Sequence, residues 1–204
     1  VKILAASGWA LDARMWKLLH GPLSPHVLEA HAAHEIGRRA KELSAAAVPF
    51  LLLGYSLGAF LSFPLLELPG ARGGVFCALA ESFVHSEANP AGAPRETLLE
   101  LKAGLSVDAP ALLADFYRRC FKPQSVMAEA LPLEPANDVP LLSAGLDTLL
   151  GADLRAQRPA KPVVLLHGAL DRILAVEGAR HMATTRGYEL VEVPGCGHAL
   201  PITA

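Results

Sequence analysis

The pentapeptide Gly54-Tyr55-Ser56-Leu57-Gly58 places a serine between two glycines in the pattern G-x-S-x-G. An apolar run, 49–53, precedes it and a second apolar stretch, 59–68, follows it, which indicates a buried strand that runs into a helix. A serine at such a sharp turn has a strained backbone and small neighbours, and its hydroxyl is exposed above the sheet edge. We therefore predict that Ser56 is a nucleophile. The alternative is a glycine-flanked serine in a tight turn without chemistry.

A nucleophilic serine needs a base and a third group that orients the base. Asp171 follows an apolar strand predicted over 162–168, and His198 lies in a glycine-flanked loop after a strand predicted over 188–193. We predict a triad of Ser56, His198 as base and Asp171 as the orienting acid. The chain order serine, aspartate, histidine is that of α/β-hydrolases and differs from the other common serine-enzyme orders. Taken singly, Asp171 could be a helix N-cap and His198 a surface loop residue.

Acyl transfer also needs N–H donors for the oxyanion of the tetrahedral intermediate. The N–H of Leu57 lies at the predicted helix start, where the helix dipole favours negative charge. The N–H of Trp9 follows Gly8 in the loop after the first predicted strand, 1–6. We predict that these two N–H groups form the oxyanion hole. The Trp9 ring could wall an acyl pocket or could be an ordinary core aromatic.

The elements that must position these residues alternate along the chain as in an open, mostly parallel sheet. Strands are expected over 1–6, 26–30, 49–53, 74–80, 162–168 and 188–193, and helices over 12–19, 35–47 and 59–68. The pattern changes between about 81 and 157, which holds helices over 95–104 and 109–121 and no convincing core strand. We predict the α/β class with an α/β-hydrolase fold, as one domain over 1–204. A helical lid of about 81–157 would be inserted between core segments 1–80 and 158–204, and the N- and C-terminal elements would be reduced.

Composition narrows the class of protein. The chain has 204 residues, of which 52% are hydrophobic, enough for a sizeable core in one domain. A net charge of −2 argues against a general nucleic-acid binder. Three widely spaced cysteines suggest neither a disulfide framework nor a zinc site, and we expect no metal and no cofactor. The first residues indicate a strand rather than a signal peptide, and no apolar run reaches membrane-spanning length. We therefore expect a cytoplasmic monomer that binds neither membrane nor nucleic acid.

Four local matches resemble one family, the pimeloyl-acyl carrier protein methyl ester esterases of biotin synthesis (BioH-type carboxylesterases). They are the Gly8-Trp9 loop with Trp16, the G-x-S-x-G turn, the lid stretches 131–133, 143–147 and 152–155, and the positions of Asp171 and His198. The lid match alone separates this family from other α/β-hydrolases. The chain departs from the family at Ser7, where the family usually has histidine, and in its short terminal elements.

The resemblance implies hydrolysis of the methyl ester of a pimeloyl chain tethered to acyl carrier protein, with release of methanol. It also implies a basic docking surface on the lid for the acidic carrier. We predict that Arg118, Arg119 and Lys122 supply this surface, although a solvated helix face is equally compatible with the pattern. Phe116 and Leu11 could line the acyl channel or simply pack in the core.

Two other functions stay open at this point. The chain could be a general short-chain carboxylesterase or thioesterase without carrier-protein specificity. It could also be a catalytically inactive hydrolase-fold binding protein, although the presence of Ser56, Asp171 and His198 argues against that class.

Overall fold

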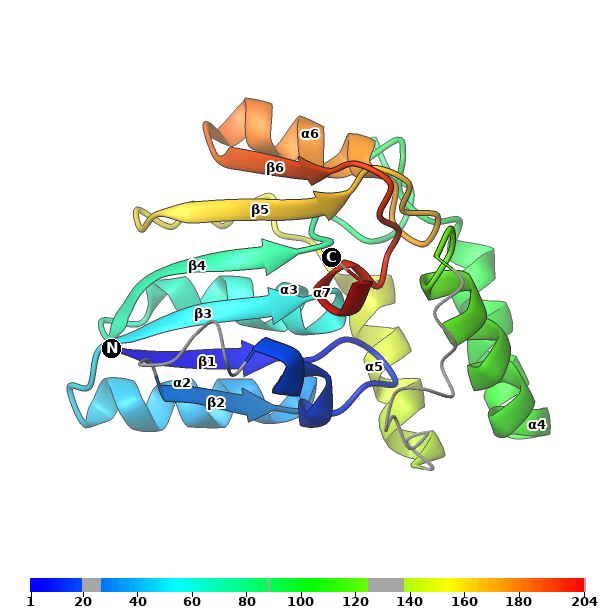
Figure 1. Ribbon diagram of the computed structural model, residues 1–204, viewed down its shortest axis with the longest axis horizontal. Helices are drawn as coiled ribbons and strands as arrows, with labels where there is room; N and C mark the ends of the chain where they lie inside the picture. Colours follow the sequence, from blue (N-terminus) through cyan, green and yellow to red (C-terminus); the bar gives the residue numbers. More distant parts are fainter. Residues whose placement is uncertain (20–26, 88, 125–137, 204) are drawn as a thin grey trace.

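The computed structural model describes residues 1–19, 27–87, 89–124 and 138–203. Within these ranges one parallel sheet has the strand order β2-β1-β3-β4-β5-β6 (Figure 1). Its strands are β1 (Lys2–Ala6), β2 (Val27–His31), β3 (Phe50–Tyr55), β4 (Ala71–Cys77), β5 (Val163–Gly168) and β6 (Glu189–Val193). Because all six strands are parallel, their carboxyl ends meet at one edge of the sheet. The predicted α/β class and parallel sheet are confirmed.

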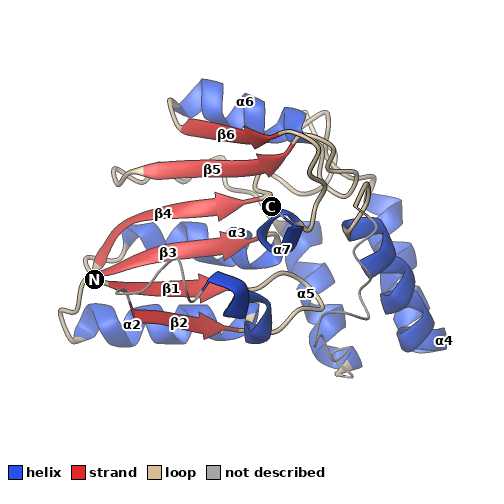
Figure 2. Cartoon of the chain, viewed as in Figure 1, coloured by secondary structure: helices blue, strands red, loops and turns tan. Residues whose placement is uncertain are grey.

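Helices cover both faces of the sheet (Figure 2). They are η1 (Ala13–Leu19), η2 (Ala33–Glu35), α2 (Ile36–Ala45), α3 (Leu57–Ser62), η3 (Phe63–Glu67), α4 (Arg95–Cys120), α5 (Val139–Gly151), α6 (Val176–Arg186) and α7 (Leu200–Thr203). Successive strand residues point to opposite faces, so Leu52 of β3 enters the larger core with α2 and α3, whereas Tyr55 enters a smaller core with η1 and α7.

The predicted bounds of one strand were wrong for a local backbone reason. The strand expected over 74–80 is β4, which begins at Ala71 and ends at Cys77 because Ala78 adopts a positive φ of 53°. The two helices expected over 95–104 and 109–121 correspond to the two parts of α4, which meet at Asp108, where φ is −153° and ψ is 83° and the backbone is not helical. Pro110 lacks an N–H and restricts the residue before it, and the Asp108 carboxylate accepts a hydrogen bond from the N–H of Ala111.

The segment between β4 and β5 lies beyond the carboxyl ends of the strands, where α4 and α5 pack side by side (Figure 1). These helices fall within the predicted lid, 81–157, whose bounds stay a prediction. The stretch 131–133, which carries part of the family resemblance, lies outside the described residues. In the part of the chain that the structure describes, no helix is both long and apolar enough to cross a membrane.

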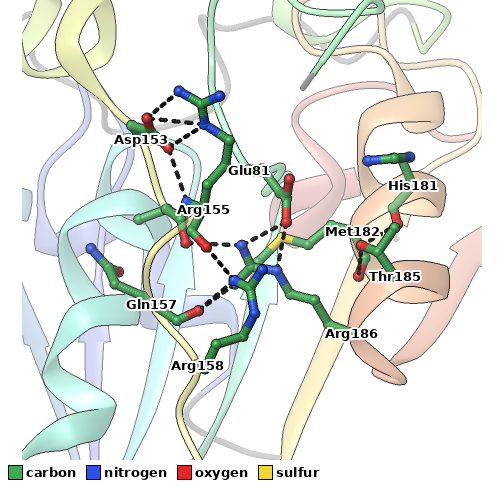
Figure 3. Close-up of polar contacts among 10 residues, drawn as sticks. Glu81, Asp153, Arg155, Gln157, Arg158, His181, Met182, Thr185 and Arg186 are labelled. Atoms are coloured by element: carbon green, nitrogen blue, oxygen red, sulfur yellow. Dashed lines mark hydrogen bonds and ion pairs between the residues drawn. The ribbon is translucent and has the colours of Figure 1, made fainter. Parts of the chain in front are cut away.

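Both ends of this segment are fixed to the end of α6 by Arg186 (Figure 3). The guanidinium donates to the carboxylate of Glu81 over 2.7 Å and to the carbonyls of Leu154 and Gln157 over 2.8 and 2.7 Å. Its side chain is buried, and so is that of Glu81, so each charge depends on the other for stabilisation. The N–H of Leu154 also donates to the carbonyl of Glu81. The start of the segment after β4 and its end before β5 are therefore held together by the buried ion pair of Glu81 and Arg186.

Candidate active site

Ser56 lies at a sharp turn between the end of β3 and the start of α3. Its φ of 50° and ψ of −120° belong to a region that non-glycine residues rarely adopt, so the surrounding contacts must hold the backbone there. A Cβ on Gly54 would lie 2.6 Å from the Cα of Ala59, and a Cβ on Gly58 would overlap the carbonyl oxygens of Ala6 and Ser7. Both glycines are therefore required by close backbone approach, as the pattern predicts.

His198 and Asp171 lie in loops at the same edge of the sheet as Ser56. Nε2 of His198 is 3.1 Å from Oγ of Ser56, and Nδ1 of His198 is 2.7 Å from Oδ2 of Asp171. All three side chains are buried. Because a carboxylate only accepts, Nδ1 of His198 carries the proton, and Nε2 is left to accept from the Ser56 hydroxyl. The structure thus brings the three residues together in a continuous hydrogen-bonded chain.

Asp171 is held by its own loop as well as by His198. Its Oδ1 accepts from the N–H groups of Ile173 and Leu174 over 2.8 and 3.0 Å. Burial opposes ionisation, but attraction to His198 when its ring is protonated, together with the N–H groups of His167 and His198, outweighs it, and the pKa of Asp171 lies well below its ordinary value. The carboxylate therefore stays ionised next to the imidazole.

The two predicted oxyanion donors flank the turn. Within the described residues, the backbone N–H groups of Trp9 and Leu57 donate to no backbone or side-chain acceptor. A Cβ on Gly145 of α5 would lie 2.7 Å from the Trp9 ring and 3.1 Å from the Leu57 side chain, so both residues pack against this one position. Two N–H donors without another acceptor, one of them on the residue that follows Ser56, could hold an oxyanion.

Ser56 and Asp171 open into a cavity of about 460 Å³. Its walls come from α4, α5 and the loops 91–94 and 171–175, and include Phe83, Leu98, Phe116, Leu146 and Leu149. The Trp9 ring forms one side, with its indole N–H donating to the Leu142 carbonyl over 2.8 Å and its ring centroid 4.8 Å from that of Phe116. The predominantly apolar lining suits an acyl chain or another apolar group.

The predicted substrate-binding residues separate into two groups. Phe116, Arg119 and Lys122 line the cavity that contains Ser56. Leu11 lines a second cavity of about 210 Å³, which it shares with Trp9 and Leu57, and it is not among the described lining residues of the first. Arg118 is exposed and also lies outside the described lining of the Ser56 cavity.

Other residues near the site were not predicted. Asp115 forms ion pairs with Arg118 over 2.9 Å and with Arg119 over 2.5 Å, which reduces the net charge of the basic surface. The hydroxyl of Tyr117 donates to the carbonyl of Ala10, next to Trp9. His167 lies against Asp171. The pattern His-Gly-x-x-Asp at 167–171 is a local signal that could have indicated this last contact.

The parallel sheet, the serine at its strand-to-helix turn, and the acid and base after later strands define the α/β-hydrolase fold. The chain belongs to the alpha/beta hydrolase family, whose family model matches residues 3–204. No curated protein sequence matches the chain significantly.

Solved structures share this fold at low sequence identity. An esterase from Exiguobacterium antarcticum is 17% identical with a TM-score of 0.80, over 97% of this chain and 85% of that one. An enol-lactonase from Burkholderia xenovorans is 16% identical with a TM-score of 0.80, over 99% and 86% of the two chains. A bromoperoxidase from Bacillus anthracis is 19% identical with a TM-score of 0.79, over 98% and 85%. At these identities the likeness concerns the fold.

We predict that Gly58→Ala lowers the reactivity of Ser56, because the added methyl group must displace the carbonyls of Ala6 and Ser7. The rate of labelling by a fluorophosphonate should fall at least about 10-fold, and urea unfolding should show a loss of about 2 kcal/mol or more. The matched control is Gly37→Ala on α2, where the added methyl group meets nothing within 4 Å. That control should keep the labelling rate and gain stability slightly. Equal behaviour of the two variants would contradict the packing argument.

Proposed function

We propose that this protein hydrolyses carboxylic esters, with Ser56 as nucleophile, His198 as general base and Asp171 as the residue that orients the base. The observation that carries the proposal is the pair of contacts that His198 makes, 3.1 Å to the Ser56 hydroxyl and 2.7 Å to the Asp171 carboxylate. Membership of the alpha/beta hydrolase family and the likeness to a solved esterase support the same reaction class.

The reaction follows from these contacts in two halves. In the first, Nε2 of His198 takes the proton of Ser56 as Oγ attacks the ester carbonyl, while Asp171 stabilises the imidazolium. The N–H groups of Trp9 and Leu57 hold the oxyanion, and each donor is typically worth about 3 kcal/mol. His198 then protonates the leaving alkoxide. In the second half, water attacks the acyl-enzyme with the same base and releases the acid.

The cavity indicates which part of the ester the protein accommodates. Its volume of about 460 Å³ lies in the lower part of the range for small-molecule sites. Aromatic and aliphatic side chains from Phe83, Phe116 and Leu146 line it beside Ser56. We infer that the acyl chain occupies this cavity and that its apolar contacts supply most of the substrate binding.

Replacing the nucleophile tests the proposal. Ser56→Ala should lower kcat for a short p-nitrophenyl ester by at least about 10³-fold, because it removes the hydroxyl that contacts Nε2 of His198. The matched control is Ser62→Ala on the same helix, because Ser62 is buried and its hydroxyl has no partner among the described residues. That variant should keep normal kcat.

Near-normal activity of Ser56→Ala would reject the assignment. A wild-type protein that neither hydrolyses esters nor reacts with a fluorophosphonate would instead support a non-catalytic binding protein of this fold. Preference for thioesters over oxygen esters would move the proposal to a thioesterase with the same triad.

A narrower proposal concerns the substrate, the methyl ester of pimeloyl-acyl carrier protein. Its support is the resemblance of the loop and lid motifs, together with the positions of Arg119 and Lys122 on the wall of the Ser56 cavity. Arg118 would extend the basic surface outward on α4. Asp115 pairs with both arginines, so the surface attracts an acidic partner less than three free cations would.

Removing the three basic residues distinguishes this substrate from a general ester. If Arg118, Arg119 and Lys122 dock an acidic carrier, their joint replacement by alanine should raise KM for the carrier-bound ester about 10-fold. KM for a small uncharged ester should change less than about 2-fold, and added salt should weaken carrier-ester turnover more in the parent than in the variant.

A control variant removes the same number of charges elsewhere, by replacing Arg38 and Lys41 of α2 and the exposed Arg72 of β4 with alanine. It should leave both KM values near those of the parent. An equal rise for the two triple variants, or no change for either, would favour the general carboxylesterase.

A further inference from the structure

We propose that His167 is a positioning residue, which holds the carboxylate of Asp171 in the orientation that His198 requires. The inference rests on the proposed function, since it assigns a second histidine to the same catalytic chain. It assigns no direct contact between His167 and the substrate.

His167 lies one residue before the end of β5, four positions before Asp171, and its side chain is 1% exposed. Nε2 of its ring is 2.8 Å from the carbonyl of Leu174 and 3.3 Å from Oδ2 of Asp171. The N–H of Leu174 donates in turn to Oδ1 of Asp171. The imidazole therefore contacts both the carboxylate and the loop that surrounds it.

The surroundings of the ring determine which nitrogen carries the proton. Both neighbours of Nε2, a carbonyl and a carboxylate, can only accept, so Nε2 must be the donor. Nδ1 is buried and has no partner among the described residues. A buried nitrogen without a partner is unfavourable, and a purely apolar side chain would avoid this loss. The feature that a leucine could not supply at this position is the Nε2–H group.

Both carboxylate oxygens of Asp171 are therefore held by neighbouring N–H groups. Oδ1 accepts from the N–H groups of Ile173 and Leu174, while Oδ2 accepts from Nδ1 of His198 and faces the N–H dipole of His167. Rotation of the carboxylate would break these contacts together. This arrangement directs a lone pair of Oδ2 at His198 before any substrate binds.

Other charged groups face the same ring. Glu192 is the register partner of His167 on the neighbouring strand β6, and Arg180 of α6 binds Glu192 over 2.5 Å. Asp171 and His198, in the loops after β5 and β6, belong to the same surroundings of the His167 ring. Since Arg180 pairs with Glu192, Asp171 is the carboxylate that responds most directly to a change at His167.

Three substitutions separate the donor from the volume of the side chain. His167→Leu removes the donor, His167→Asn places an amide too close to the backbone to reach Asp171, and His167→Gln places an amide nitrogen at the position of Nε2. We expect kcat for a short p-nitrophenyl ester to fall about 10-fold in the Leu and Asn variants and to recover most of that loss in the Gln variant.

The dependence of kcat/KM on pH distinguishes a positioning role of His167 from a purely structural one, because loss of packing alone would not shift this profile. A carboxylate that has lost a donor attracts the imidazolium of His198 more strongly, so the acidic limb of the kcat/KM profile should move to higher pH in the Leu and Asn variants. The Gln variant should keep the limb of the parent. If urea unfolding shows that the Leu variant is not folded, the comparison of the Asn and Gln variants tests the proposal by itself.

The proposal is overturned if Asn and Gln lose activity equally without movement of the limb, or if neither loses any. Fluorophosphonate labelling keeps this outcome distinct from failure of the proposed function. A parent protein in which Ser56 is not labelled refutes the hydrolase mechanism itself. Normal labelling of Ser56 in the parent, with the same rate in the Asn and Gln variants, refutes only the role of His167.

Discussion

The left-handed backbone at Ser56 is the constraint around which the site is arranged. At φ 50° the chain reverses sharply from β3 into α3, and it can do so only where Gly54 and Gly58 let neighbouring backbone pass at close range. The carbonyls that touch Gly58 belong to the end of β1 and the residue after it, and this segment leads directly to Trp9. The turn at Ser56 therefore positions its hydroxyl and the start of α3, and through Gly58 it packs against the segment that leads to Trp9.

The helix α4, between β4 and β5, contacts the loops on both sides of Ser56. The C-terminal part of α4 contacts the Trp9 loop through the Tyr117 hydroxyl, and the Cys120 carbonyl accepts from the N–H of Ala199, next to His198. A Cβ on Gly197 would overlap the carbonyl of Lys122, so the histidine loop and the end of α4 are packed backbone against backbone. Arg186 fixes the two ends of the inserted segment to the end of α6 (Figure 3). The position of α4 is thus coupled to both loops that flank Ser56.

The sequence predicted those parts of the molecule whose signals are local. The strand and helix around Ser56, the parallel sheet and the loops of Asp171 and His198 follow from apolar runs and glycines within a few residues. The placement of Leu11 in a separate cavity, the pairing of Asp115 with the lid arginines and the contact of His167 with Asp171 depend on packing that apolar periodicity does not encode. The break at Asp108 between the two parts of α4 agrees with the two helices predicted over 95–104 and 109–121. Carrier-protein specificity, oligomeric state and cellular location stay predictions.

The central claim is that Ser56 forms a covalent acyl intermediate. The most direct measurement is rapid acid quenching of the protein during turnover of a p-nitrophenyl ester, followed by mass spectrometry of its peptides. The account predicts one acyl group per chain, located on Ser56, and a burst of p-nitrophenol whose size matches the acylated fraction. Steady turnover with no acyl group on Ser56, or with the acyl group on another residue, would contradict it.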